Sequence, residues 1–326
     1  MWTKDRRILL DAPPDEDTNP RPEAIWPTDA VRTGLSGVVA PRVIRLPDGM
    51  YRMFYTQILP QPGHPGGAND YDHSMARIIS AHSTDGENWQ PEPGVRLGPV
   101  DAGNDILRVV SSEVVPTADA NTLRMYFECS AGPQSDSNSI RSALSTDEGL
   151  TWRLEEGDRL AKRGCNYSAP RIVFLDNGQS RLYCYERGRG IISAIAGMDG
   201  LQFQLEPGVR IAQDGPYDRC FAFAPEIVRT PETPSYVMYY AGYREPNRAF
   251  ILRATSSEGL NWIKEPQPAI SPGPTGWDAA KSSEMCIIRL PTPPGSPPRY
   301  RMFYEACDGT AQGERGVWRI VSATTT

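Results

Sequence analysis

Five charged residues occupy one shared position of a segment that is repeated along the chain. Each follows two small or proline residues in an otherwise apolar strand pattern, and they are Arg42, Glu113, Arg171, Glu226 and Glu284. Charged groups in apolar strands are costly unless they pair with one another or face a water-filled pocket. The column therefore predicts either a catalytic centre built on carboxylates or a set of structural ion pairs.

The order of the charges suggests how acid and base roles would be divided. No arginine separates Glu226 from Glu284 in that order, so repulsion is expected to raise the pKa of one of them and leave a proton donor. Glu113 falls between Arg42 and Arg171, so it is expected to stay ionised and act as base or nucleophile. In the structural alternative, the two arginines neutralise the carboxylates and no chemistry follows.

Further candidates lie in the segments that lead into or follow the repeated strands, because connections placed by a rigid scaffold often carry function. The substrate-binding candidates are Arg42, Arg171, Asp105, Arg108, Tyr167, Asp218, Arg219, Trp277, Asp278, Glu128, Glu186, Tyr243 and Glu305. The aromatic members suit stacking on a sugar, and they suit packing equally well.

Metal and thiol chemistry receive little support. The loop 64–73 contains two His and two Asp, which are ligand types, but their spacing matches no short metal motif. A solvated loop is expected there, and no metal or cofactor is predicted. The six cysteines form no Cys-x-x-Cys pair and are expected to be free thiols; Cys165 and Cys220 each precede a column position by six residues, where packing is the preferred interpretation.

The elements that must position these residues recur five times. In four copies a Gly-containing turn leads to an aromatic residue and then, eight residues later, to an apolar one; the pairs are Trp89 with Leu97, Trp152 with Leu160, Phe203 with Ile211 and Trp262 with Ile270. An aromatic run on the second strand recurs at 52–55, 124–127, 181–184, 237–240 and 301–304. The turns are expected to be architectural, with the aromatic residue packed between sheets.

The fifth copy of the turn is divided between the termini. The chain ends near Ser322-Ala323, which matches the Ser-Ala pairs that open other turns, and it begins with Trp2, which has Leu10 eight residues later. Residues 1–10 are therefore predicted to complete the sheet of the C-terminal repeat. Internal repetition at this period is typical of propellers. We predict an all-β fold, a single domain over 1–326 forming a five-bladed β-propeller of four-stranded antiparallel blades, with 11–35 as a connecting or capping segment.

Composition excludes several classes of function. The net charge of −6 is spread along the chain, so no nucleic-acid surface is expected. The N-terminus lacks an apolar core of signal-peptide length, and no stretch approaches the ~20 apolar residues of a membrane span. A soluble, cytoplasmic protein with no membrane partner is predicted, and its oligomeric state is left open.

Two resemblances follow from these motifs. Five repeats with charged residues in the first strands, and the run from Ala40-Pro41-Arg42 to Tyr55, resemble the five-bladed propeller glycosidases, such as arabinanases, xylosidases and invertases. The turn from Ser145 to Trp152 resembles the Asp-box of sialidases, a six-bladed family. The resemblance implies a carbohydrate substrate and catalytic carboxylates. The glycosidases place an acidic residue in the first blade, however, where this chain has Arg42.

The leading hypothesis is a glycoside hydrolase-like enzyme that acts on a carbohydrate or glycosylated small molecule. Glu113 would be the base or nucleophile and Glu226 or Glu284 the proton donor, while Arg42 and Arg171 would orient the ligand. Two alternatives stay open. One is a lyase, cyclase or isomerase that transfers protons without hydrolysis; the other is a sugar-binding propeller without catalysis.

Overall fold

The regular secondary structure of the described residues is almost entirely β-strand, as predicted. A computed structural model describes residues 1–11, 37–60, 74–103, 106–119, 121–132, 137–230, 235–309 and 316–325. Within these ranges the one α-helix is α1 (Pro99–Ala102), and no helix is long and apolar enough to cross a membrane. The segment 12–36, the loop 61–73 and Asp105 lie outside the described residues, so the predictions made for them remain predictions.

The strands form consecutive antiparallel groups. The groups are β2 (Gly37–Arg45), β3 (Tyr51–Pro60), β4 (Ser74–Ser83) and β5 (Gln90–Leu97); β6 (Arg108–Pro116), β7 (Leu123–Ser130), β8 (Ser139–Ser145) and β9 (Arg153–Leu154); β10 (Tyr167–Phe174), β11 (Ser180–Glu186), β12 (Gly190–Ala196), β13 (Gln204–Leu205) and β14 (Ile211–Ala212); β15 (Phe221–Arg229), β16 (Tyr236–Glu245), β17 (Arg248–Ser256) and β18 (Ile263–Lys264); and β19 (Lys281–Leu290), β20 (Arg299–Cys307), β21 (Trp318–Thr325) and β1 (Trp2–Leu10).

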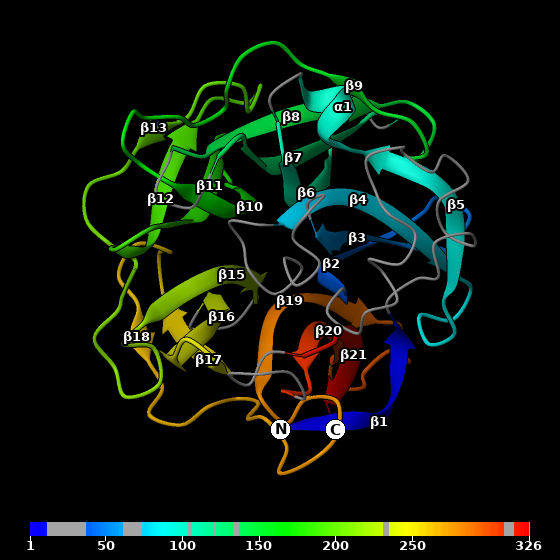
Figure 1. Ribbon diagram of the computed structural model, residues 1–326, viewed down its shortest axis with the longest axis vertical. Coiled ribbons are helices and arrows are strands. Elements are labelled where there is room, and N and C mark those ends of the chain that lie inside the picture. The colour runs from blue at the N-terminus through cyan, green and yellow to red at the C-terminus, as the bar shows by residue number, and fades with distance from the viewer. Residues whose placement is uncertain are drawn as a thin grey trace.

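These groups surround a common centre. Figure 1 shows the first strand of each group, β2, β6, β10, β15 and β19, nearest to that centre, with the later strands farther out. Single parallel bridges, such as Ala76 with Arg108 and Ala249 with Lys281, link neighbouring groups and merge most of them into one mixed sheet. These bridges lie at the start of the first strands, so they hold that end of the centre together.

The N-terminal strand belongs to the C-terminal group. β1 pairs antiparallel with β21, from Trp2 opposite Thr325 to Leu10 opposite Ile320. Asp5 accepts a hydrogen bond from the Ser322 hydroxyl (2.5 Å), just as Glu155 of the second group accepts one from Ser142 (2.6 Å). The N-terminal segment therefore supplies the same contact that the outer segment of another group makes.

Aromatic residues after the turns pack between neighbouring groups, as predicted. Each meets an aromatic side chain of the preceding group edge-on, and the pairs are Trp152 with Phe54, Phe203 with Tyr126, Trp262 with Tyr183, Trp2 with Tyr239 and Trp89 with Phe303, at centroid distances of 5.6 to 6.1 Å. Trp2 thus takes the place in the last group that Trp152 and Trp262 take in theirs.

The turns themselves use their polar side chains internally. The Asp147 carboxylate accepts hydrogen bonds from the amides of Leu150 (3.1 Å) and Thr151 (2.9 Å), and the Ser145 hydroxyl accepts one from the Gly149 amide (2.9 Å). The polar side chains of such a turn find their hydrogen-bond partners within the turn itself, which agrees with an architectural role.

Truncation of the N-terminal aromatic residue tests how much β1 contributes. Trp2→Ala removes the edge-on contact with Tyr239 and should lower the free energy of unfolding by roughly 2 to 3 kcal/mol, somewhat less than the full burial value because Trp2 is partly exposed. Urea unfolding measures the change. Ile263→Ala, at a residue that is 75% exposed, is the control and should change stability by less than 0.5 kcal/mol, a range typical of surface sites. Equal, small effects would show that β1 is dispensable.

Candidate active site

A bulge interrupts the first strand of every group and decides which side chains face the centre. The register skips between Val39 and Arg42 in β2, where two residues lie opposite one, and the equivalent residues of the other groups do the same. The first bulged residue has a positive φ in four groups, namely Ala40, Ser111, Ala169 and Ala224. A left-handed backbone strains any residue that has a Cβ, and Ala and Ser avoid the further crowding that a β-branched or bulky side chain would cause there.

The fifth strand differs at this bulge. Phe54 pairs with Arg42, Tyr126 with Glu113, Tyr183 with Arg171, and Tyr239 with Glu226, whereas the corresponding Phe303 pairs with Cys286. The charged column therefore ends in Cys286. The prediction that placed Glu284 in the column was wrong by two residues, because Ser282-Ser283-Glu284 imitates Ser111-Ser112-Glu113 in sequence but occupies a different register.

Four column residues form a buried ion cluster. Arg42 Nε lies 2.8 Å from Glu113 Oε2, and Arg42 Nη1 lies 3.2 Å from Glu226 Oε2. Arg171 Nε lies 3.1 Å from the same Glu226 oxygen and 4.0 Å from Glu113 Oε2. Glu113, Arg171 and Glu226 are nearly inaccessible to solvent. The arrangement matches the structural ion pairs that the sequence left open.

The cluster is also tied to the backbone of neighbouring strands. Glu113 Oε1 accepts a hydrogen bond from the Ile172 amide (3.2 Å), and Glu226 Oε1 accepts one from the Ile287 amide (2.9 Å). Burial raises the pKa of Glu113 even though Arg42 and Arg171 oppose that rise. The expectation that flanking arginines alone would decide its ionisation left out this desolvation. Each carboxylate thus joins adjacent strands at the centre.

Arg171 corrects a second expectation. Its Nη2 lies 3.8 Å from Glu284 Oε1, and its Nε contacts Glu226, so an arginine does stand between these two carboxylates. The predicted direct repulsion of Glu226 and Glu284 is therefore replaced by a shared cation. The reason is that Glu284 sits two residues before its assumed position.

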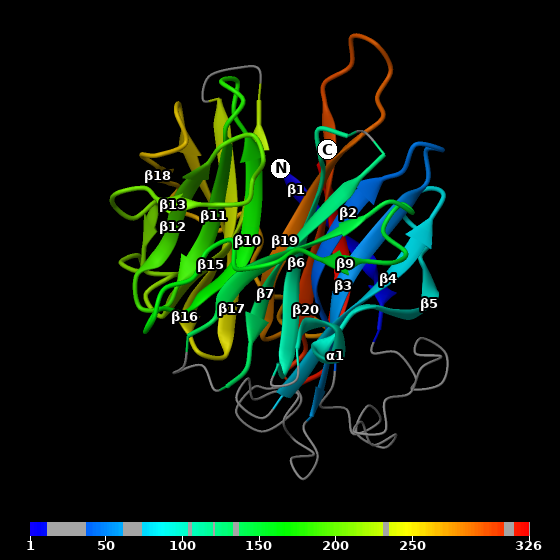
Figure 2. The ribbon, with the colours of Figure 1, turned by 90° about the horizontal axis from the view of Figure 1, so that it is seen from above.

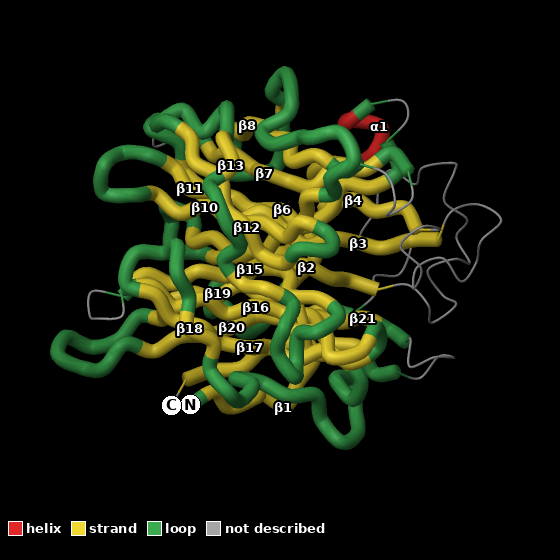
Figure 3. Tube along the Cα trace, turned by 90° about the vertical axis from the view of Figure 1, so that its left-hand side faces the viewer, coloured by secondary structure: helices red, strands yellow, loops and turns green. Residues whose placement is uncertain are grey.

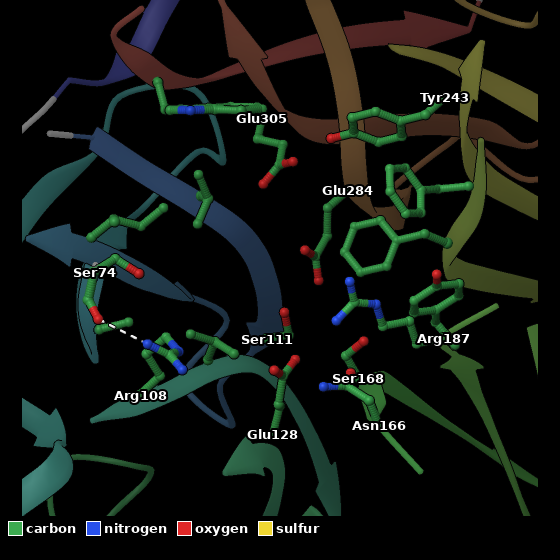
Figure 4. A pocket seen from close by; sticks show the side chains of 18 of the residues that line it. Ser74, Arg108, Ser111, Glu128, Asn166, Ser168, Arg187, Tyr243, Glu284 and Glu305 are labelled. Atoms are coloured by element: carbon green, nitrogen blue, oxygen red, sulfur yellow. Dashed lines mark hydrogen bonds between the residues drawn. The ribbon is translucent and has the colours of Figure 1, made fainter. Parts of the chain in front are cut away.

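Above this cluster lies a cavity of about 330 Å³ at the end where the first strands begin. Figure 4 shows this pocket from close by. Its described lining comprises Val39, Ile58, Ser74, Ala76, Arg108, Val110, Ser111, Glu128, Asn166, Ser168, Tyr185, Arg187, Phe221, Phe223, Tyr243, Pro246, Lys281, Glu284, Glu305 and Trp318. Figures 2 and 3 show that α1 also lies toward one end of the strands, away from the chain termini. Of the predicted catalytic residues, Glu284 lines this pocket.

Glu284 and Glu305 form an interacting acid pair in the pocket. Figure 4 shows both carboxyl groups directed into the cavity. Burial and the negative charge of Glu284 raise the pKa of Glu305 to about 8, although hydrogen bonds from the Ser283 hydroxyl (2.5 Å) and the Ala40 amide (3.0 Å) oppose the rise. Burial also raises the pKa of Glu284, against the pull of Arg171. The pair therefore holds a proton at neutral pH.

Glu128 enters the pocket from β7, and Figure 4 places its carboxyl group across from Glu305, with Glu284 between them. The Asn138 amide group donates a hydrogen bond to Glu128 Oε1 (2.6 Å) and so orients it. Arg108 is buried beside it and donates to the Ser74 carbonyl (3.0 Å) and the Ser130 hydroxyl (3.0 Å). A proton-holding pair and a separate, oriented carboxylate are the components of acid and base catalysis.

Of the substrate-binding candidates, Arg108, Glu128, Tyr243 and Glu305 line the pocket. The Tyr243 hydroxyl donates to Ser283 Oγ (3.3 Å), which in turn contacts Glu305. Sequence reasoning thus found four lining residues through their positions beside the strands.

Other candidates are engaged elsewhere. Tyr167 is fully buried in the hydrophobic core, because its side chain points away from the centre while Asn166 and Ser168 point into the pocket. Asp218 is buried and accepts hydrogen bonds from the Tyr240 hydroxyl (3.0 Å) and Lys264 Nζ (2.7 Å). Neither belongs to the described lining of the cavity.

The remaining candidates also serve local structure. Arg219 is exposed and donates to the Arg244 carbonyl (2.9 Å), and Glu186 pairs with Arg189. Trp277 packs on the hydrophobic core of the last groups, and Asp278 pairs with Lys4 of the N-terminal strand. None of these four is part of the described pocket lining, because strand-flanking segments also carry side chains that brace the outer strands.

Several lining residues escaped the sequence analysis, among them Tyr185, Arg187, Phe221, Phe223, Lys281 and Trp318. A signal for some of them exists. Counting five residues back from the corrected column reaches Arg108, Asn166, Phe221 and Lys281, and counting three back reaches Val39, Val110, Ser168 and Phe223. An alignment of the repeats with Cys286 as the fifth column residue would therefore have predicted these lining residues. Across the described residues, no group of three or more His, Cys, Asp or Glu is arranged to hold a metal ion.

No protein-family model and no curated protein matches the chain. Solved structures do. A putative glycosidase from Bacteroides thetaiotaomicron is 14% identical with a TM-score of 0.70, covering 99% of this chain and 96% of that one. An N-acetylgalactosamine deacetylase from F. plautii, in complex with blood group B trisaccharide, is 18% identical with a TM-score of 0.68 over 99% and 95% of the chains. A thermostable family-43 glycoside hydrolase is 16% identical with a TM-score of 0.66 over 89% of each.

The likeness is one of fold. At these identities, the neighbours confirm the resemblance to glycosidase-type β-folds that the sequence indicated, and their activities remain their own.

Proposed function

We propose that this protein is a glycoside hydrolase-like enzyme that acts on a carbohydrate or a glycosylated small molecule in the central pocket. The observation that carries the proposal is the pair of buried carboxyl groups of Glu284 and Glu305, which point into a cavity that also contains the oriented Glu128 carboxyl group. Burial raises the pKa of both members of the pair, which suits them to hold a proton. The glycosidase fold of the structural neighbours supports it.

The roles differ from those expected from the sequence. The acid pair donates a proton to the leaving oxygen of the glycosidic bond, and Glu128 acts as the base or nucleophile. Arg42, Glu113, Arg171 and Glu226 hold the inner strands in place beneath the pocket, so they are positioning residues. Arg171 also contacts Glu284 and so connects the ion cluster with the acid pair.

We further propose that the strand groups are the blades of a single five-bladed propeller closed by β1. The pairing of β1 with β21, the edge-on contact of Trp2 with Tyr239 and the radial order in Figure 1 support this proposal. Such a closure would place the five first strands around one axis, with the described pocket at their starting ends.

Activity toward a panel of glycosides of common hexoses and pentoses tests the function. The rate should fall as pH rises above about 8, because the proton donor then loses its proton. The sign follows from the raised pKa: the acid form is present below that value and disappears above it. A rate that keeps rising through pH 9 would contradict the assignment of the Glu284 and Glu305 pair as the acid.

Product mass separates hydrolysis from the alternatives. Hydrolysis adds one water, isomerisation or cyclisation leaves the mass unchanged, and a binding protein without catalysis gives no product. The acid pair and Glu128 also suit proton transfer without hydrolysis, so an unchanged mass would shift the assignment to that class.

A further inference from the structure

One wall of the pocket is aromatic. Phe221 and Phe223 lie two residues apart on β15, so both side chains point to the same face of the strand, and both are partly exposed. Tyr185 stands edge-on to Phe223 at 5.7 Å, and Tyr243 stands edge-on to Phe221 at 5.7 Å. Both phenylalanines line the cavity, and the two tyrosines pack against them.

The internal repeats show that the fold does not require these rings. The residues that correspond to Phe223 in the other first strands are Val39, Val110, Ser168 and Ser283. The equivalent of Phe221 is Arg108 in β6 and Lys281 in β19. An aromatic pair in a cavity, where four equivalent strands do without one, marks a surface that a ligand covers.

A second apolar wall completes the cavity. Val39, Ile58, Ala76 and Val110 line it from β2, β3, β4 and β6. Figure 1 shows these strands across the centre from β15 and β16. Among the polar lining groups, Glu128 and Glu305 are already hydrogen-bonded to Asn138 and Ser283. The cavity therefore offers two apolar walls in addition to its polar lining groups.

We propose that these two walls hold a flat, apolar aglycone, so that the substrate class is glycosides of aromatic or similarly flat apolar alcohols. This inference rests on the proposed function and adds the aglycone to it. The sugar lies against Glu284, Glu305 and Glu128, while the aglycone stacks on Phe221 and Phe223. The cavity of about 330 Å³ is at the lower end of the ~300 to 1,000 Å³ typical of small-molecule sites, which suits one sugar ring and a compact aglycone.

Paired ligands test the inference through binding rather than turnover. Phenyl and methyl glycosides of the same sugars are titrated by calorimetry into Glu305→Gln, which keeps the pocket shape and is expected to be inactive. The phenyl member should bind about tenfold more tightly, because ring stacking and apolar burial add to affinity. In Glu305→Gln/Phe223→Val the ratio should fall to about two. Val occupies the equivalent position in β2 and β6, so this variant should fold.

Phe174→Val is the matched control, since Phe174 is half exposed and lies outside the described lining of the central pocket. It should keep the tenfold ratio. Equal affinities of phenyl and methyl glycosides, or absence of binding of every phenyl glycoside, would overturn the aglycone site. Phenyl glycosides that bind but are never cleaved by the unaltered protein would refute the proposed function and leave the aglycone site standing.

Discussion

Replacing Glu305 with glutamine is expected to lower the turnover of a cleaved glycoside by about 10²- to 10⁴-fold, the usual contribution of a general acid. The midpoint of thermal unfolding should hardly move. At neutral pH the Glu305 carboxyl group is largely protonated, because burial and Glu284 raise its pKa to about 8, and glutamine has the same shape and charge as that form. Glutamine can still accept from the Ala40 amide and bond with Ser283, but it has no proton to transfer.

Steady-state rates and a thermal melt of the same preparation measure both effects. Asp158→Asn serves as the control, because Asp158 is a surface carboxylate paired with Arg141 at 3.0 Å. It should leave both quantities unchanged. Full activity in Glu305→Gln would remove Glu305 from the mechanism, and a large loss of stability would show that its role is structural.

The second large effect concerns stability. Arg171→Met should lower the free energy of unfolding by about 3 to 5 kcal/mol, the range for a buried ion network that loses one partner. Arg171 is buried and lies within 4.0 Å of carboxylate oxygens of Glu113, Glu226 and Glu284. Its removal takes away the cation beside Glu284 and leaves Arg42 alone to pair with Glu113 and Glu226, so the cost arises from buried negative charge that is no longer fully compensated.

Urea unfolding of the Arg171→Met variant measures this effect, and the Arg229→Met variant is the control. Arg229 pairs with the exposed Asp176 at 3.0 Å, and such surface pairs contribute about 0 to 1 kcal/mol. The double variant Arg171→Met/Glu226→Gln should recover part of the loss, because the two residues are in contact. Unchanged stability with abolished activity would instead return the column residues to a catalytic role.

Local patterns were enough to predict the repeats and their packing. The spacing from turn aromatic to apolar residue identified Trp89, Trp152 and Trp262 as equivalent, and the same spacing from Trp2 to Leu10 identified the N-terminal strand as part of the C-terminal group. These features repeat because each turn and each contact between neighbouring groups meets the same local requirement. These features could therefore be predicted from the sequence alone.

The site was decided by tertiary structure. Whether Glu226 and Glu284 face each other depends on where the bulge lies in each strand. The similar runs Ala224-Pro225-Glu226 and Ser282-Ser283-Glu284 differ by two residues in their register relative to that bulge. Glu113 and Glu226 are buried beneath the pocket and do not line it. The reason is their position along their strands, which brings their carboxylates to Arg42 and Arg171.

What the amino-acid order alone determined is an all-β chain of repeats with charge gathered at its centre. The position of each carboxyl group along its strand was decided by the tertiary structure. A difference of two residues places a carboxyl group in the cavity instead of the ion cluster, and burial and a neighbouring acid there let the pair keep a proton. Such a shift leaves residue types and spacing nearly unchanged, so only the folded arrangement shows it.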